Sequence, residues 1–129
     1  MKILHVVGTV LVILFAGACK PTAIRTVEPD VFEQMLARTS DSQLVDVRTL
    51  KEFGEGHLPG AVLIDVKSVD FDSLILTLDK ACPVFVYCRS GKRSLDAAGR
   101  LEKSGFKAVY DLGGGIIAWK AQGKEVVMP

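Results

Sequence analysis

The sequence predicts one α/β domain, in which helices cover both faces of a mainly parallel sheet of five strands. A chain of 129 residues is long enough for one domain with a substantial hydrophobic core. Segments typical of strands alternate with helical patterns at short intervals, which is the order that produces a parallel sheet. The segment 83–87 is almost wholly apolar, as expected for a parallel strand that is buried on both faces.

The first eighteen residues have the pattern of a secretory signal rather than of a fold element. Lys2 precedes an apolar run over residues 3–15, and the small residues 16–18 follow directly before Cys19. The run is shorter than the roughly 20 residues that a helix needs to span a bilayer. Because a cysteine follows the small residues, the segment resembles a bacterial lipoprotein signal, whose cleavage leaves a lipidated N-terminal cysteine.

This resemblance implies that residues 1–18 are removed, that Cys19 is lipidated and that residues 19–23 form a tether before a domain over 24–129. The protein would then be exported to the bacterial cell envelope or periplasm and held to a membrane by its lipid anchor. The lipoprotein pattern prefers Leu, Val or Ile three positions before the cysteine, where this chain has Ala16. An ordinary cleaved signal and an uncleaved anchor are therefore alternatives.

The predicted mature domain has no electrostatic signature of nucleic-acid binding. The chain has 16 basic and 15 acidic residues, and loss of residues 1–18 would remove only one of these charges, that of Lys2. The remaining domain would be formally neutral. Its one concentration of positive charge lies between Arg89 and Arg93, which is too short for a basic stripe, so we expect no nucleic-acid partner.

The first half of the domain predicts two strands and two helices. Residues 23–27 alternate between apolar and polar side chains and predict the first strand. A proline suits the first position of a helix over 29–38, in which apolar residues recur at helical spacing. The second strand covers 43–47. Thr49 then caps a short helix, with Glu52 at the spacing of a capping box.

The second half of the domain continues this alternation. A third strand is predicted over 61–64, and apolar residues at helical spacing predict a helix over 69–78. The buried strand 83–87 leads into a helix over 91–104, which ends before a glycine. The last predicted elements are a strand over 107–112, a short helix over 116–121 and an edge strand over 126–127.

Two cysteines lie within the predicted domain, and their spacing argues against a disulfide. Cys82 and Cys88 are separated by a strand that spans roughly 20 Å, which exceeds the reach of a disulfide. Cys82 is therefore predicted to be a small buried residue before the strand. Cys88 is left as a free thiol in an exported protein, which indicates a chemical role.

Cys88 is predicted to lie at the carboxyl end of the buried strand, and this edge is where open α/β sheets bind their ligands. The backbone N–H groups of residues 89–93 can surround one point there, and the next helix directs the positive end of its dipole toward it. Arg89, Lys92 and Arg93 add positive charge. These features predict an anion site that lowers the pKa of the Cys88 thiol, so that the thiolate is the main form at neutral pH.

Three reactions use a thiolate beside an anion: hydrolysis of phosphate esters, transfer of sulfane sulfur, and thiol–disulfide exchange. Exchange enzymes usually carry a resolving cysteine, but Gly91 occupies the corresponding position. Cysteine phosphatases place five residues between the cysteine and the arginine that binds phosphate, whereas four separate Cys88 from Arg93. The shorter loop favours transfer of sulfane sulfur.

Several motifs of the chain resemble the signatures of the rhodanese family. They are two opening signatures, an active loop and a closing signature, and they match Leu44–Arg48 with Glu52-Phe53, Gly56–Ala61, Tyr87–Ser94, and Leu112–Gly115 with Trp119. The motifs occur in the order of the family and cover about residues 24–127. The resemblance implies a rhodanese-like fold of three layers, α/β/α, around the five-stranded sheet.

The resemblance also implies a single-domain sulfurtransferase in which Cys88 is the nucleophile. Cys88 would attack the outer sulfur of thiosulfate or a related sulfane donor and carry that sulfur as a persulfide. A thiophilic acceptor, such as cyanide or a thiol, would then remove it. The expected partners are a small anionic donor and such an acceptor, with a protein sulfur acceptor as a further candidate. No cofactor or metal is expected.

The residues of the active loop are expected to bind the substrate. Their backbone N–H groups would stabilise the persulfide anion and their side chains would hold the donor; they are Arg89, Ser90, Gly91, Lys92, Arg93 and Ser94. Asp46 and Arg48, at the end of the second strand, are expected to brace the loop rather than do chemistry. Two alternatives stay open: a non-catalytic rhodanese-like module that binds a partner or senses sulfur or redox state, and a cysteine phosphatase, which the loop length disfavours.

Overall fold

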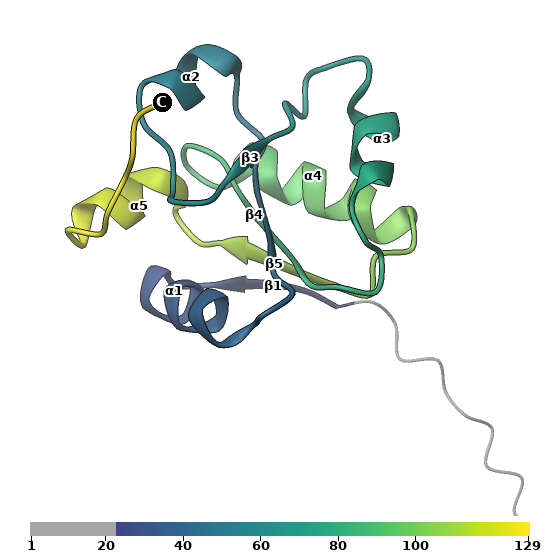
Figure 1. Cartoon of the computed structure of the whole chain (residues 1–129), viewed down its shortest axis with the longest axis horizontal. Helices are drawn as coiled ribbons and strands as arrows, with labels where there is room; N and C mark the ends of the chain where they lie inside the picture. Colours follow the sequence, from purple (N-terminus) through teal and green to yellow (C-terminus); the bar gives the residue numbers. More distant parts are fainter. Residues whose placement is uncertain (1–22) are drawn as a thin grey trace, which may run out of the picture.

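The computed structural model describes residues 23–129 (Figure 1). The predicted signal over 1–18, the predicted lipidation site Cys19 and residues 20–22 of the predicted tether lie outside the described residues. Within the part of the chain that is described, no helix combines the length and the apolar character that a membrane crossing requires.

Five strands form one sheet in which every neighbouring pair is parallel. The strands are β1 (Ala23–Val27), β2 (Gln43–Asp46), β3 (Val62–Leu63), β4 (Val84–Tyr87) and β5 (Ala108–Leu112). Their order across the sheet is β1-β5-β4-β2-β3, so the wholly buried strand β4 lies at the centre. The predicted α/β domain with a five-stranded, mainly parallel sheet is confirmed.

Helices cover both faces of this sheet (Figure 1). They are α1 (Pro29–Arg38), α2 (Leu50–Gly54), α3 (Phe71–Leu74), α4 (Lys92–Lys103) and α5 (Gly115–Ala121), with a 3-10 turn, η1, over Ile75–Thr77. The side chains of β4 alternate between the two faces. Val84 and Val86 join the core beneath α3 and α4, while Phe85 and Tyr87 join the core beneath α1 and α5.

Three local predictions need correction. The helix expected over 69–78 is one turn of α-helix followed by η1, because only Phe71 and Ile75 of this segment are fully buried and Val69 is 99% exposed. Cys82 is half-buried rather than buried, because it lies in the turn before β4. The edge strand expected over 126–127 is a single antiparallel bridge between Val127 and His57.

The bridge cannot extend into a strand because of the residues that follow His57. Its two hydrogen bonds, His57 N–H to Val127 O at 2.9 Å and the reverse at 2.8 Å, complete the pairing. Hydrogen-bonding positions alternate along an antiparallel strand, so the next residue to pair is Pro59, which has no N–H to donate, while the N–H of Leu58 donates to the Tyr87 hydroxyl at 3.0 Å. The C-terminal segment is therefore attached to the loop after α2 at one point.

Candidate active site

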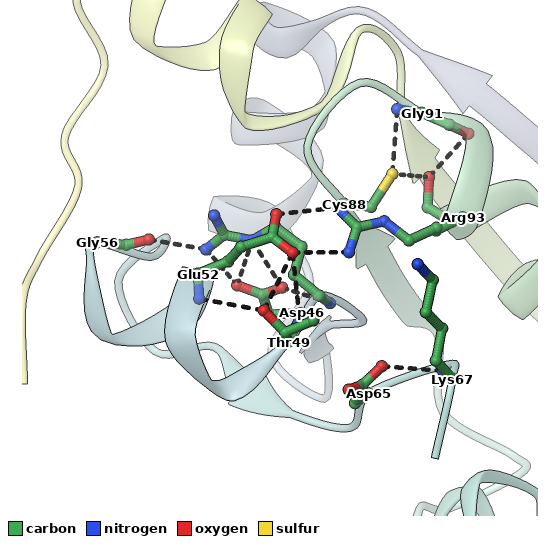
Figure 2. A network of polar contacts seen from close by, with 11 residues as sticks. Asp46, Thr49, Glu52, Gly56, Asp65, Lys67, Cys88, Gly91 and Arg93 are labelled. Carbon is green, nitrogen blue, oxygen red and sulfur yellow. Dashed lines mark hydrogen bonds and ion pairs between the residues drawn. The ribbon is translucent and has the colours of Figure 1, made fainter. Parts of the chain in front are cut away.

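The residue that follows β4 is Cys88, whose side chain is buried beneath a tight loop that leads into α4. The N–H of Gly91 donates to the Cys88 Sγ at 3.1 Å, and the hydroxyl of Ser94 lies 3.5 Å from the same sulfur (Figure 2). Gly91 has φ of +110°, a conformation that favours glycine, and it is the residue directly before α4. This turn is what directs backbone N–H groups toward the sulfur.

These contacts change the acidity of the thiol. Burial is the largest single influence and opposes ionisation, but the hydroxyl of Ser94 and the backbone N–H groups of Ser94, Gly91 and Ser90 together outweigh it. The pKa of the Cys88 thiol is therefore lowered from its ordinary value. A buried thiolate that accepts hydrogen bonds is a prepared nucleophile.

Replacing Ser94 by alanine is expected to raise the pKa of Cys88. The thiolate would lose the hydroxyl that stabilises it and keep the burial that disfavours it, so its formation would shift to higher pH. The measurement is the rate of Cys88 alkylation by iodoacetamide as a function of pH, on a chain in which Cys19 and Cys82 are replaced by serine.

Ser90→Ala is the matched control, because Ser90 lowers the pKa of Cys88 through its backbone N–H, which alanine keeps. Its alkylation midpoint should equal that of the parent chain. If Ser94→Ala left the midpoint in place as well, the hydroxyl would have no part in stabilising the thiolate.

Helix α5 holds the loop from its other side. The N–H of Ile116 donates to the carbonyl oxygen of Cys88 at 2.9 Å, and the N–H of Ile117 donates to that of Arg89 at 3.2 Å. These donors belong to the first turn of α5, where N–H groups have no partner within the helix. The loop carbonyls are thus occupied by α5, while the loop N–H groups remain available to the sulfur.

Arg93 is neutralised by a carboxylate from another element. Its guanidinium donates to both oxygens of Glu52 in α2, at 2.7 and 2.9 Å (Figure 2). The hydrogen bond from Arg93 is the largest influence on Glu52 and, with the N–H of Thr49, lowers the pKa of that carboxyl to about 2 against the opposing effect of burial. The expected capping box of Thr49 and Glu52 is confirmed, but Glu52 also binds the arginine expected to hold the donor. Donor binding by Arg93 stays a prediction.

Asp46 and Arg48 form a buried ion pair at the carboxyl end of β2. The Arg48 Nη2 and Asp46 Oδ2 atoms are 2.6 Å apart. Asp46 is 0% exposed and Arg48 is 4% exposed. Arg48 also donates to the carbonyl oxygen of Gly56, at 2.7 Å, in the loop after α2. The pair therefore connects β2 to the segment that carries Glu52, and the Arg48 guanidinium also lies over the ring of Tyr87, 5.6 Å from its centroid, at the start of the active loop.

A hollow of about 780 Å³ lies in front of the loop, and the structure brings four of the predicted donor-binding residues to it. Its walls are Thr49, Glu52, Val66, Lys67, Arg89, Ser90, Lys92, Arg93 and Asp96. Of the two other predicted residues, Gly91 forms the turn and Ser94 is buried beside the sulfur. Within residues 23–129 there is no cluster of three or more histidine, cysteine, aspartate or glutamate side chains that could hold a metal ion.

Sequence reasoning missed three charged residues of the hollow, Glu52, Lys67 and Asp96. The sequence predicts Glu52 only as part of a helix cap and of a family motif, and it predicts no role for Lys67 or Asp96. Lys67 follows β3, which pairs with β2 in the same parallel sheet. Ligands bind beyond the carboxyl ends of parallel strands, and Lys67 lies beyond the carboxyl end of β3 as Cys88 lies beyond that of β4.

Comparison with known proteins gives one consistent family. A family model described as "Rhodanese-like domain" matches residues 28–122. The chain is 35% identical to a protein of Allochromatium vinosum named "Sulfurtransferase", over 82% of this chain and 97% of that one. It is also 35% identical to "Thiosulfate sulfurtransferase GlpE" of Pseudomonas aeruginosa, over 74% of this chain and 83% of that one.

Solved structures have the same fold. A rhodanese-like domain protein from Staphylococcus aureus superposes with a TM-score of 0.70 at 28% identity, and the match covers 81% of this chain and 98% of that one. A rhodanese-related protein from Thermoplasma volcanium superposes with a TM-score of 0.72 over 81% of this chain and 99% of that one, at 24% identity.

Proposed function

The chain belongs to the family of rhodanese-like domains, and we propose that it is a sulfurtransferase that moves sulfane sulfur through a persulfide on Cys88. Relatives at about 35% identity are named sulfurtransferases, which supports the reaction class. The observation that carries the proposal is the set of backbone N–H groups and the Ser94 hydroxyl around the Cys88 sulfur, which together lower the pKa of the thiol.

The first half-reaction loads the enzyme. The Cys88 thiolate attacks the outer sulfur of thiosulfate, a bond forms between this sulfur and Sγ, and the sulfur–sulfur bond of the donor breaks. Sulfite leaves with the electron pair of that bond, and Cys88 keeps the outer sulfur as a persulfide anion. Arg89 and Lys92, both exposed in the hollow, attract the anionic donor toward the buried thiolate.

The second half-reaction regenerates the thiolate. A thiol or cyanide acceptor attacks the outer sulfur of the persulfide, and the electron pair of the breaking bond returns to Sγ. The donors that stabilise the thiolate before the reaction stabilise it again as the leaving group, since they are held in place by α4 and α5.

Mass spectrometry of the protein after incubation with thiosulfate tests the proposal. The expected result is the gain of one sulfur atom, which cyanide removes and which is absent in Cys88→Ser. Cys82→Ser is the matched control and should still gain the sulfur, because Cys82 lies in the turn before β4. If no sulfane donor loaded the chain, the non-catalytic module would become the better interpretation.

A further inference from the structure

Asp111 is a buried carboxyl group to which neither half-reaction assigns a role. It lies in β5, is 1% exposed, and forms no ion pair with a cation of residues 23–129. The hydroxyl of Thr26 in the neighbouring strand β1 donates to its Oδ2 at 2.9 Å. Its Oδ1 is the one buried side-chain nitrogen or oxygen atom of the described residues that has no hydrogen-bond partner. Such an atom is rare and requires an explanation.

The register of the sheet places Asp111 beneath the start of α4. Asp111 pairs with Val86 of β4, so both side chains point to the face of the sheet that α4 covers. Ser94 is fully buried and precedes Ala97 and Ala98 by three and four residues, so it lies on the face of α4 that packs on this core. Because α4 packs directly on β5, Ser94 and Asp111 face each other.

The surroundings of Asp111 favour a neutral carboxylic acid. The elements packed around it present Thr26 from β1, Val86 from β4 and Ser94 from α4, none of which is titratable. Cys88, on the other side of Ser94, is the titratable side chain of this cluster. Burial raises the pKa of the Asp111 carboxyl, and the hydroxyls of Ser94 and Thr26 offset this effect only in part. A buried carboxylate without a cation would be far more costly than the neutral acid.

The Ser94 hydroxyl connects Asp111 to the nucleophile. It donates to the carbonyl oxygen of Gly91 at 3.1 Å and lies 3.5 Å from the Cys88 sulfur. A hydroxyl has a single proton to donate and can accept hydrogen bonds as well. An ionised Asp111 would compete with the sulfur for that proton and would repel the thiolate. A neutral Asp111 offers a proton to the Ser94 oxygen and leaves the hydroxyl proton to the sulfur.

We propose that Asp111 is a positioning residue, a neutral carboxylic acid whose Oδ1–H donates to the Ser94 oxygen, so that the Ser94 hydroxyl donates to the Cys88 sulfur. The proposal rests on the proposed function, in which that sulfur is the nucleophile. The proton of Asp111 stays on the carboxyl group throughout. Negative charge leaves Sγ when the persulfide forms and returns when the acceptor removes the outer sulfur, and the polarised hydroxyl stabilises it each time.

The pH profile of Cys88 alkylation tests the proposal, on the full chain in which Cys19 and Cys82 are replaced by serine. Asp111→Asn should keep the midpoint of the parent chain, because the amide N–H can donate to Ser94 as the acid does. Asp111→Ala should raise the midpoint by roughly half a pH unit, since a neighbouring hydrogen bond supplies only part of the strength of the Ser94 bond. In a chain that already carries Ser94→Ala, Asp111→Ala should add no further shift.

Val109→Ala is the matched control. Val109 is fully buried in β5 two residues before Asp111, on the same face, so its truncation opens a cavity there without removing a hydrogen-bond donor. Its alkylation midpoint should equal that of the parent chain. A lowered midpoint in Asp111→Asn would mean that Asp111 is ionised and repels the thiolate, and an unchanged midpoint in Asp111→Ala would mean that Ser94 does not depend on it; either result overturns the proposal.

A measurement on the unsubstituted chain does not depend on how well a variant folds. The carboxyl carbon of Asp111, identified by its absence in Asp111→Asn, should have the ¹³C chemical shift of a neutral acid at neutral pH, and the shift of a carboxylate would refute the assignment. The two proposals also fail separately. A chain with the expected midpoints that gains no sulfur from any sulfane donor overturns the sulfurtransferase alone, whereas sulfur transfer with midpoints that ignore Asp111 overturns only the positioning role.

Discussion

Replacement of Gly115 by alanine is expected to reduce sulfur transfer by about 100-fold, because it displaces the loop that holds Cys88. A Cβ atom at this position would overlap the carbonyl group of Arg89 and lie 2.7 Å from the carbonyl oxygen of Cys88. Both contacts are with backbone, which cannot rotate away as a side chain can. Relief of the overlap requires α5 and the loop to separate, and this breaks the hydrogen bonds from Ile116 and Ile117.

The effect of the overlap can be separated from that of backbone strain. Gly115 has φ of +60°, so alanine there is also conformationally unfavourable. Gly123 has φ of +72°, but a Cβ atom at that position would meet nothing within 4 Å. Gly123→Ala should therefore cost about 1–2 kcal/mol of stability through strain alone and retain transfer activity.

The measurements are the rate of persulfide formation from thiosulfate and the free energy of unfolding in urea, for both variants. If Gly115→Ala and Gly123→Ala transferred sulfur equally well, the packing of α5 against the loop would not control the position of Cys88. Such a result would indicate that contacts on the α4 side of the loop, at Gly91 and Ser94, control the position of Cys88.

Replacement of Asp46 by alanine is expected to lower the free energy of unfolding by about 3–5 kcal/mol. The side chain of Arg48 is 5% exposed, and it donates to both oxygens of Asp46. Removing the carboxylate would leave a buried guanidinium whose only other hydrogen bond within residues 23–129 is to the Gly56 carbonyl. Urea denaturation, monitored by circular dichroism, measures the change.

Two further variants identify the cause of this loss. Glu55→Ala removes an exposed ion pair, in which Glu55 Oε1 lies 3.7 Å from Lys51 Nζ. It should change the free energy of unfolding by less than about 1 kcal/mol. Adding Arg48→Met to Asp46→Ala should recover part of the loss, since it removes the unpaired buried charge. An Asp46→Ala variant as stable as Glu55→Ala would show that the buried pair is not needed to hold β2 to the loop after α2.

The pairing of Arg93 with Glu52 changes how positive charge is distributed at the site. Arg89, Lys92 and Arg93 are close together in the sequence, which predicts that all three bind the anionic donor. In the folded chain one of them forms a two-pronged ion pair, in which the side chains are only 22% and 23% exposed. The field at Cys88 therefore depends more on oriented N–H groups than on formal charge, and the cations outside the ion pair line the hollow.

Local patterns in the sequence determined most of the fold. The strands and the long helices α1 and α4 begin and end within one or two residues of the predicted positions, because periodicity, a proline and glycines act over a few neighbouring residues. The same local logic predicted Cys88 at the end of the buried strand. It failed for the segment 69–78, where contacts of Phe71 and Ile75 with the core, rather than the apolar pattern, decide how far the helix extends.

Only the tertiary structure decided which charges and hydrogen-bond donors meet at Cys88. Glu52 and Arg93 are 41 residues apart in the chain, Lys67 lies on a third segment, and the donors of α5 come from beyond β5. Their proximity follows from the order β1-β5-β4-β2-β3, which places the ends of β2, β3 and β4 side by side. Strand order depends on how the hydrophobic cores on the two faces of the sheet pack, and a local sequence pattern does not determine that packing.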